Sequence, residues 1–197
     1  MLSTALTLLR IAVLIFSFYG LFQFTLTKLS VNVDFVIPIV FASVGSVLFL
    51  SGILRILPAV AVLILLGGVY LGIRSIISRE NFFGVVSAGT VFFAAISVFL
   101  AFIIYGAKVV AYDDFSHWAI VMRPLVNSNR FPNSSDYGIS FASYPLGSAS
   151  FIYYFSFVTG IKAEWMYMYS KTVLTAGMLT SLSYTPPCRN PKLCNPI

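Results

Sequence analysis

The residues with the clearest chemical potential lie in one short run, "AYDDFSHWAIVMR", at 111–123. Two adjacent carboxylates, Asp113 and Asp114, are followed by His117, the only histidine of the chain. If a helix begins near Asp114, the imidazole stands on the same face as the two carboxylates, because residues three and four apart are neighbours. Such a cluster could orient a base, abstract a proton from a hydroxyl, or hold a divalent cation. The three residues are therefore the candidate catalytic residues, and the two aspartates are candidate metal ligands.

An alternative interpretation gives the aspartates a structural role and no catalytic one. Asp113 or Asp114 could cap the free N–H groups of a helix, where the dipole favours negative charge. This accounts for one aspartate more easily than for an adjacent pair. An apolar stripe at helical spacing follows the acids, formed by Phe115, Trp118, Ala119 and Met122. The stripe predicts a short helix that lies in the membrane interface and ends before Pro124.

The composition places the chain in a membrane. Of its 197 residues, 59% are hydrophobic and only 9% are charged, with a mean hydropathy of +0.94. Soluble domains carry roughly 25% charged residues. Aromatic residues reach 16%, which suits lipid-facing surfaces and interfacial belts. The formal charge of +6 comes from basic residues scattered singly, so a nucleic-acid partner is not expected.

The elements that must position the cluster are membrane helices, each needing about 20 apolar residues. Four segments qualify before the cluster, at 4–27, 33–54, 56–73 and 82–107, which together make up a unit at 1–107. Residues 108–144 form a turn-rich extracytoplasmic loop that contains the DDFSHW motif. One or two further spans follow in 145–184, at 145–161 and 164–184, and a proline-rich irregular tail occupies 185–197. We therefore expect an all-α integral membrane protein with about five to six transmembrane helices and one extracytoplasmic loop carrying a short interfacial helix.

The basic residues also predict an orientation. Lys28, Arg74 and Arg79 fall on one side of the predicted spans, whereas Arg10, Arg55 and the long loop fall on the other. The rule that short cytoplasmic loops are enriched in Lys and Arg favours the first side as cytoplasmic. The loop with the two aspartates then lies on the outer face.

The motif and its surroundings resemble a known family. "YDDFSHWAIVMR", then "FPN", "SYPLGSASFIYYFSFVTG" and a further aromatic helix are similar to the first extracytoplasmic loop of multi-spanning GT-C-type glycosyltransferases of the bacterial envelope. The similarity covers about 112–160, around a quarter of the chain. It implies a multi-pass protein of the bacterial cytoplasmic membrane that takes sugar from a polyprenyl phosphate donor. The acceptor would be an envelope glycan or lipid, and the membrane lipid would surround the site.

The resemblance also implies roles for single residues. Asp113 or Asp114 would be the base or the metal-linked anchor for the acceptor, at the headgroup level where the donor carries its reactive carbon. Tyr144 would contact the substrate and, with Pro145 and Gly147, open the next span. The departing phosphate needs positive charge, for which the candidates are Arg123, Arg130, Lys108 and Lys162. Each of these cations could instead be solvated or contact a lipid headgroup.

The family builds its site from many more spans, so we expect this chain to be an amino-terminal fragment that is inactive by itself.

Two further functions stay open beside the enzyme. A permease-like component could use the acids and the histidine as a proton relay. A non-catalytic membrane subunit would instead assemble with a partner protein that the sequence does not identify.

A glycine pair in the third predicted span concerns helix packing. "GVYLG" places Gly68 and Gly72 four residues apart, which lets another helix approach closely. Packing within the same chain is the preferred interpretation, ahead of dimerisation. Motifs for ATP hydrolysis, zinc proteolysis and esterase chemistry do not occur in the sequence.

Overall fold

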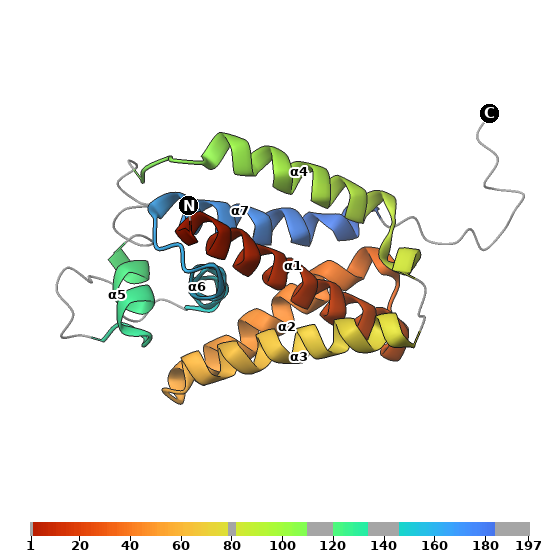
Figure 1. Ribbon diagram of the computed structural model, residues 1–197, viewed down its shortest axis with the longest axis horizontal. Coiled ribbons are helices and arrows are strands. Elements are labelled where there is room, and N and C mark those ends of the chain that lie inside the picture. Colours follow the sequence, from red (N-terminus) through yellow and green to blue (C-terminus); the bar gives the residue numbers. More distant parts are fainter. Residues whose placement is uncertain (1, 79–81, 110–119, 134–145, 184–197) are drawn as a thin grey trace, which may run out of the picture.

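The chain folds as a helical bundle. The computed structural model describes residues 2–78, 82–109, 120–133 and 146–183, and within these ranges all regular structure is helical (Figure 1). The α-helices are α1 (Leu2–Lys28), α2 (Val33–Ile53), α3 (Leu57–Ile77), α4 (Ala88–Ile104), α5 (Ile120–Ser128), α6 (Gly147–Thr159) and α7 (Glu164–Leu179). Two short 3₁₀ segments, Phe82–Val85 and Thr180–Ser183, precede α4 and follow α7. The all-α prediction is thus confirmed for the described residues.

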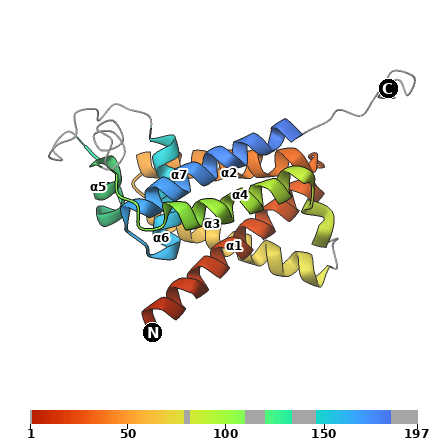
Figure 2. The ribbon, with the colours of Figure 1, turned by 90° about the horizontal axis from the view of Figure 1, so that it is seen from above.

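In the part of the chain that the structure describes, three helices are long and apolar enough to cross a membrane. They are α1, α2 and α3, whose most apolar stretches carry only 22–33% buried residues. Large hydrophobic side chains therefore point away from the protein, including Leu9, Ile15, Leu63 and Ile77. The first turns of α1 even extend beyond the other helices (Figure 2). So much outward apolar surface is typical of a protein surrounded by lipid.

The fourth predicted span begins later than the sequence indicates. Residues 82–107 were expected to form one helix, but a 3₁₀ segment ends at Val85 and α4 begins only at Ala88. Ser87 caps α4: its Oγ accepts the N–H of Thr90 at 3.2 Å, while the Thr90 Oγ1 accepts the N–H of Ser87 at 2.7 Å. This reciprocal pair is a capping box, and it fixes the start of the helix. The 17 residues of α4 span about 25 Å.

Helix α6 runs across the bundle. It is seen end-on in Figure 1, whereas α1, α2, α3, α4 and α7 run across the same view. Its 13 residues span about 20 Å, which is shorter than the hydrocarbon core of about 30 Å. The predicted fifth span over 145–161 is therefore not supported. The expected total of five to six spans stays a prediction.

Helices α1 and α3 pack through glycines. Ser17 lies against Gly68, and Gly20 lies against Gly68 and Gly72, so the backbones of the two helices nearly touch at these residues. The Ser17 hydroxyl donates a hydrogen bond to the Leu65 carbonyl at 3.1 Å. The prediction that the GxxxG pair serves packing within the chain is confirmed.

The core forms around α6. Phe151, Tyr153 and Tyr154 of this helix are fully buried. Phe18 of α1 and Phe41 of α2 complete an aromatic cluster, with ring centroids 5.3 Å apart between these two and 4.9 Å apart between Phe41 and Phe151. Tilted and edge-on ring pairs at such distances are favourable beyond the area they bury. The cluster therefore holds α1, α2 and α6 together.

Helix α5 corrects one expectation. The predicted interfacial helix was to end before Pro124, but α5 continues through this proline to Ser128. Proline removes one backbone hydrogen bond. Met122 and Leu125, on either side of it, are fully buried in the core that contains α6. Burial of each such side chain contributes about 1.5–3 kcal/mol, which offsets the lost bond.

Candidate functional site

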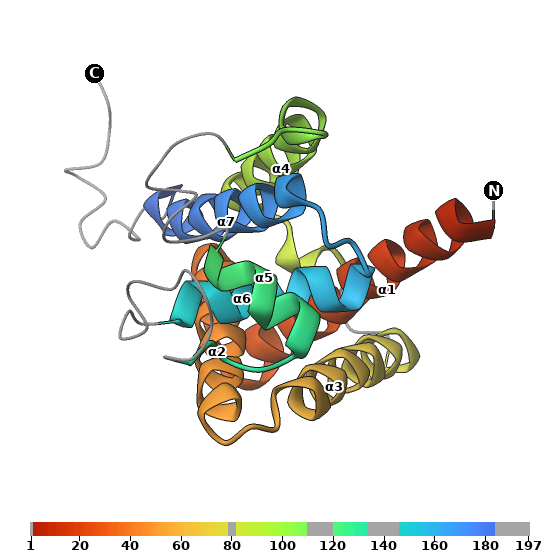
Figure 3. The same ribbon diagram turned by 90° about the vertical axis from the view of Figure 1, so that its left-hand side faces the viewer.

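One group of polar residues in the described chain lies where α5, α6 and α7 meet. Figure 3 shows α5 in front of α6 at this end of the bundle, with α7 beside them. The stretch that follows α4, ending at Val109, reaches the same place, because its backbone contacts the first residue of α7. Segments far apart in the sequence thus build one site.

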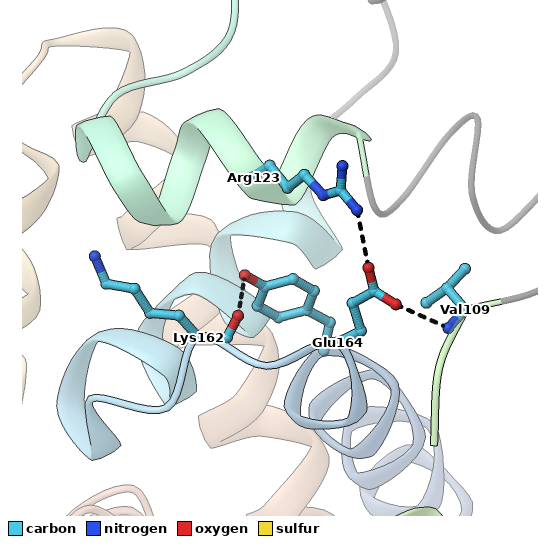
Figure 4. Close-up of polar contacts among 5 residues, drawn as sticks. Val109, Arg123, Lys162 and Glu164 are labelled. Carbon is cyan, nitrogen blue, oxygen red and sulfur yellow. Dashed lines mark hydrogen bonds and ion pairs between the residues drawn. The ribbon is translucent and has the colours of Figure 1, made fainter. Parts of the chain in front are cut away.

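Glu164 holds two of these segments at once. Its Oε1 accepts a hydrogen bond from the Arg123 Nη2 on α5 at 3.0 Å, which is also an ion pair. Its Oε2 accepts the backbone N–H of Val109 at 3.1 Å (Figure 4). We call this arrangement of Val109, Arg123 and Glu164 the Glu164 clasp. It fixes the chain on both sides of residues 110–119.

The charge of Glu164 is stabilised by its neighbours. The hydrogen bond from Arg123, followed by that from the Val109 N–H, lowers the pKa of the Glu164 carboxyl below its usual range, and the nearby charge of Lys108 lowers it further. The carboxylate is therefore ionised at neutral pH. The side chains of Arg123 and Glu164 are 54% and 27% exposed, so solvent screens the pair and its contribution is about 0–1 kcal/mol.

The turn between α6 and α7 sets the position of Glu164. Helix α6 ends at Gly160, which adopts the left-handed backbone conformation with φ of 74°. A side chain there would also meet the Arg10 guanidinium, which lies close to the Gly160 backbone. At the start of α7, the Tyr167 hydroxyl donates a hydrogen bond to the Lys162 carbonyl at 2.9 Å. The turn is thus held from both helices.

Two further contacts join the end of α5 to α6 and to this turn. The Tyr153 hydroxyl of α6 donates to the Asn129 Oδ1 at 2.9 Å, just after α5 ends. The Lys162 Nζ makes a longer contact of 3.5 Å with the Asn127 Oδ1. In Figure 4 the Lys162 side chain extends away from Glu164, while Arg123 points toward it. The two cations therefore lie on different sides of the site.

The residues predicted from the sequence divide into two groups. Asp113, Asp114, His117 and Tyr144 lie outside the described residues, so their catalytic, metal-binding and substrate roles stay predictions. Arg123 and Arg130 are described, and both belong to the α5 end of the bundle. Arg123 takes part in the Glu164 clasp, and the Arg130 Nη1 donates to the Phe131 carbonyl at 3.1 Å. Their predicted contact with a phosphate is untested.

Sequence reasoning missed Glu164 as part of the site. One signal was available, because the chain has only six acidic residues and Glu164 opens an otherwise largely apolar helix. Its partners gave no signal, since Arg123 and Val109 precede it by 41 and 55 positions. The three residues meet only after folding.

Apolar cavities lie beside the helices. One of about 290 Å³ is bounded by α1, α4 and α7 and is lined by residues such as Leu14, Phe93 and Val173. Another of about 410 Å³ lies between α2, α6 and α7. Both have linings suited to an apolar chain and not to a charged group.

The described carboxylates give little support to a metal centre. Among the residues that the structure describes, no group of three His, Cys, Asp or Glu side chains comes together. Both oxygens of Glu164 already accept hydrogen bonds. The predicted metal role of Asp113 and Asp114 lies outside the described residues and stays a prediction.

Comparison of the chain with known protein families, curated proteins and solved structures finds no match. The resemblance to GT-C-type glycosyltransferases gains no support from relatives. Function must therefore be inferred from the residues and their arrangement.

Proposed function

We propose that this chain is part of a GT-C-type glycosyltransferase, which moves a sugar from a polyprenyl phosphate carrier to an acceptor in the bacterial envelope. The Glu164 clasp is the observation that carries the proposal. One carboxylate fixes Val109 on one side of residues 110–119 and Arg123 on the other. The segment that contains the predicted catalytic residues is thus tied to the first residue of α7 by both of its flanks.

The proposed reaction uses the acids of this segment. The acceptor hydroxyl oxygen forms a bond to the anomeric carbon of the sugar while the bond from that carbon to the phosphate oxygen breaks. The lipid phosphate leaves with the electron pair, and the hydroxyl proton passes to Asp113 or Asp114. His117 orients the acid that acts as base. Assistance of this kind is typically worth about 10²- to 10⁴-fold in rate.

In the proposed site, the phosphate of the donor binds where α5, α6 and α7 meet, and its lipid chain lies in an apolar cavity. Lys108, near the Glu164 clasp, and Lys162, on another side of the site, are exposed cations that could attract a phosphate. Arg123 contributes less, because part of its charge is compensated by Glu164. The cavity between α1, α4 and α7 has the lining that a polyprenyl chain requires. Substrate contacts by Arg130 and Tyr144 complete the proposed site.

The proposal is tested by changing one acid at a time. Asp113→Asn and Asp114→Asn are compared with Asp136→Asn, a matched change in the same predicted loop. The protein is expressed from its complete open reading frame, and membranes receive polyprenyl phosphates that carry a radiolabelled sugar. We expect label transfer to membrane acceptors to fall by about 10²-fold or more in at least one of the first two variants. Transfer that survives in both would overturn the proposal.

A second candidate function is a non-catalytic membrane subunit. It is favoured by one observation: both carboxylate oxygens of Glu164 accept hydrogen bonds that connect segments of the fold. In that case the clasp only stabilises the fold. Asp113→Asn and Asp114→Asn would then leave any function of the assembled complex unchanged, and a stable protein partner would co-purify with the chain.

A further inference from the structure

A second polar feature lies at the other end of the bundle, where α1 and α3 end (Figure 1). A small recess there is lined by Phe24, Thr27, Lys28, Leu71, Arg74 and Ser75. Lys28 is the last residue of α1, and Arg74 lies in the last turn of α3. We propose that this recess binds a phosphate group. The site is independent of the proposed glycosyltransferase function.

The charges of the recess favour an anion. Lys28 and Arg74 line the same small space, and none of the six lining residues is acidic. In the described part of the chain neither cation takes part in an ion pair, since the one ion pair found there joins Arg123 and Glu164. Each cation alone is favourable near a helix C-terminus. Two of them side by side repel one another, and a phosphate between them would relieve that repulsion.

Ser75 gives independent evidence for a ligand. The residue is only 2% exposed, and its Oγ is buried without a hydrogen-bond partner among the described residues. A buried hydroxyl left without a partner is unfavourable. Because Ser75 lines the recess, a phosphate oxygen that enters it would accept the missing hydrogen bond. Lys28 and Arg74 alone do not account for the buried Ser75 hydroxyl that has no hydrogen-bond partner among the described residues.

The size of the recess restricts how the ligand sits. Its volume is about 10 Å³, which is room for about one oxygen-sized group. One phosphate oxygen therefore enters, and the rest of the ligand stays outside between Lys28 and Arg74, whose side chains are exposed. A phosphate diester or monoester fits this arrangement, and a bulky anion that must be enclosed does not.

The phosphate can come from an anionic lipid or from solution. Helices α1 and α3 are both long enough to cross a membrane, so their ends lie near the headgroups. Lipid phosphate is abundant at that depth, and the cytoplasmic leaflet is anionic. Inorganic phosphate has the same recognising chemistry. Lipid retention and the response to inorganic phosphate distinguish the two sources.

The test measures lipid retention. The purified chain is taken from vesicles of phosphatidylcholine with a minor fraction of phosphatidylglycerol, and native mass spectrometry counts the lipids that stay bound. We expect one retained phosphatidylglycerol, with retention at least about tenfold weaker in the Lys28→Gln/Arg74→Gln double variant, since charge-assisted contacts are lost. Ser75→Ala should weaken retention by about tenfold or less. Arg55→Gln, a cation between α2 and α3 at the opposite end, is the matched control.

A second arm adds inorganic phosphate to the chain in a maltoside detergent, which carries no phosphate group. A rise in the Tm of the wild-type chain that the double variant lacks would support the site with free phosphate as its ligand. The proposal is overturned if phosphatidylglycerol is retained equally by wild type, double variant and control while phosphate leaves the Tm unchanged. Neither readout involves sugar transfer, so failure here is distinct from failure of the proposed enzyme. The exposed positions of Lys28 and Arg74 allow both changes without loss of the fold.

Discussion

The α1–α3 contact and the α5–α7 end are stabilised in different ways. In the first, small residues let two backbones approach closely, with Gly20 against Gly68 and Gly72. In the second, the Glu164 clasp joins three segments by partly exposed polar side chains and a backbone N–H. Packed backbones cannot move without separating the helices, whereas side chains in solvent can rearrange. We therefore expect the first region to determine stability and the second to determine local geometry.

The largest effect should come from the glycine contact. In Gly20→Ala the new methyl group would meet the Gly68 carbonyl oxygen and the Gly72 backbone nitrogen, so α1 and α3 must separate. We expect the free energy of unfolding to fall by about 1–3 kcal/mol. Thermal or denaturant unfolding in one detergent measures this change.

Gly67→Ala is the matched control for that change. It adds the same methyl group to α3 at a position where nothing lies within 4 Å. The free energy of unfolding should stay constant or rise by up to about 1 kcal/mol, as alanine favours helix. Equal losses in the two variants would mean that the close approach of α1 and α3 does not control stability.

A smaller effect is expected at the junction of α5 and α6. Tyr153→Phe removes the hydrogen bond to the Asn129 Oδ1 but keeps the buried ring. The free energy of unfolding should fall by about 0.5–1.5 kcal/mol, as is usual for one hydrogen bond. The same change at Tyr105, which is largely exposed, should have an effect within about 0.5 kcal/mol. A Tyr153 variant as stable as the Tyr105 variant contradicts the prediction.

The smallest effect on stability should come from the clasp itself. A double-mutant cycle with Arg123→Gln and Glu164→Gln should give a coupling energy of about 0.2–1 kcal/mol, because both side chains are partly exposed. A coupling larger than the loss of stability in Gly20→Ala would reverse the order proposed for the two regions.

The pH dependence of that coupling follows from the lowered pKa of Glu164. A carboxyl whose pKa is lower in the folded chain stabilises the fold fully above its unfolded pKa of about 4.3. The stabilisation is lost as the pH falls through the folded value, which lies lower still. Unfolding measured from pH 8 to pH 5 should therefore give a constant coupling, with a decline only below about pH 4. A decline already near pH 6 would indicate that Arg123 does not stabilise the carboxylate.

The predictability of the two regions differs for a physical reason. Helix α1 was expected at 4–27 and is found at Leu2–Lys28, since apolar length is a local property of the sequence. The GxxxG pair was also recognised, although its partner Gly20 could not be named. The Glu164 clasp was missed because its members are distant in the chain and no local pattern connects them. The cap at Ser87, which divides the fourth predicted span, was local but was outweighed by the long apolar run around it.

The crosswise position of α6 has a consequence for biogenesis. This helix contacts α1, α2, α3, α5 and α7, and its central side chains are wholly enclosed by them. Its length and its buried Ser150, Ser156 and Thr159 make it a poor candidate for insertion into lipid on its own. Synthesis proceeds from the amino terminus, so α1 to α3 reach the membrane before residues 147–159 are made. The innermost helix is therefore made after α1 to α3 but before α7, so its enclosure is complete only once α7 has followed it.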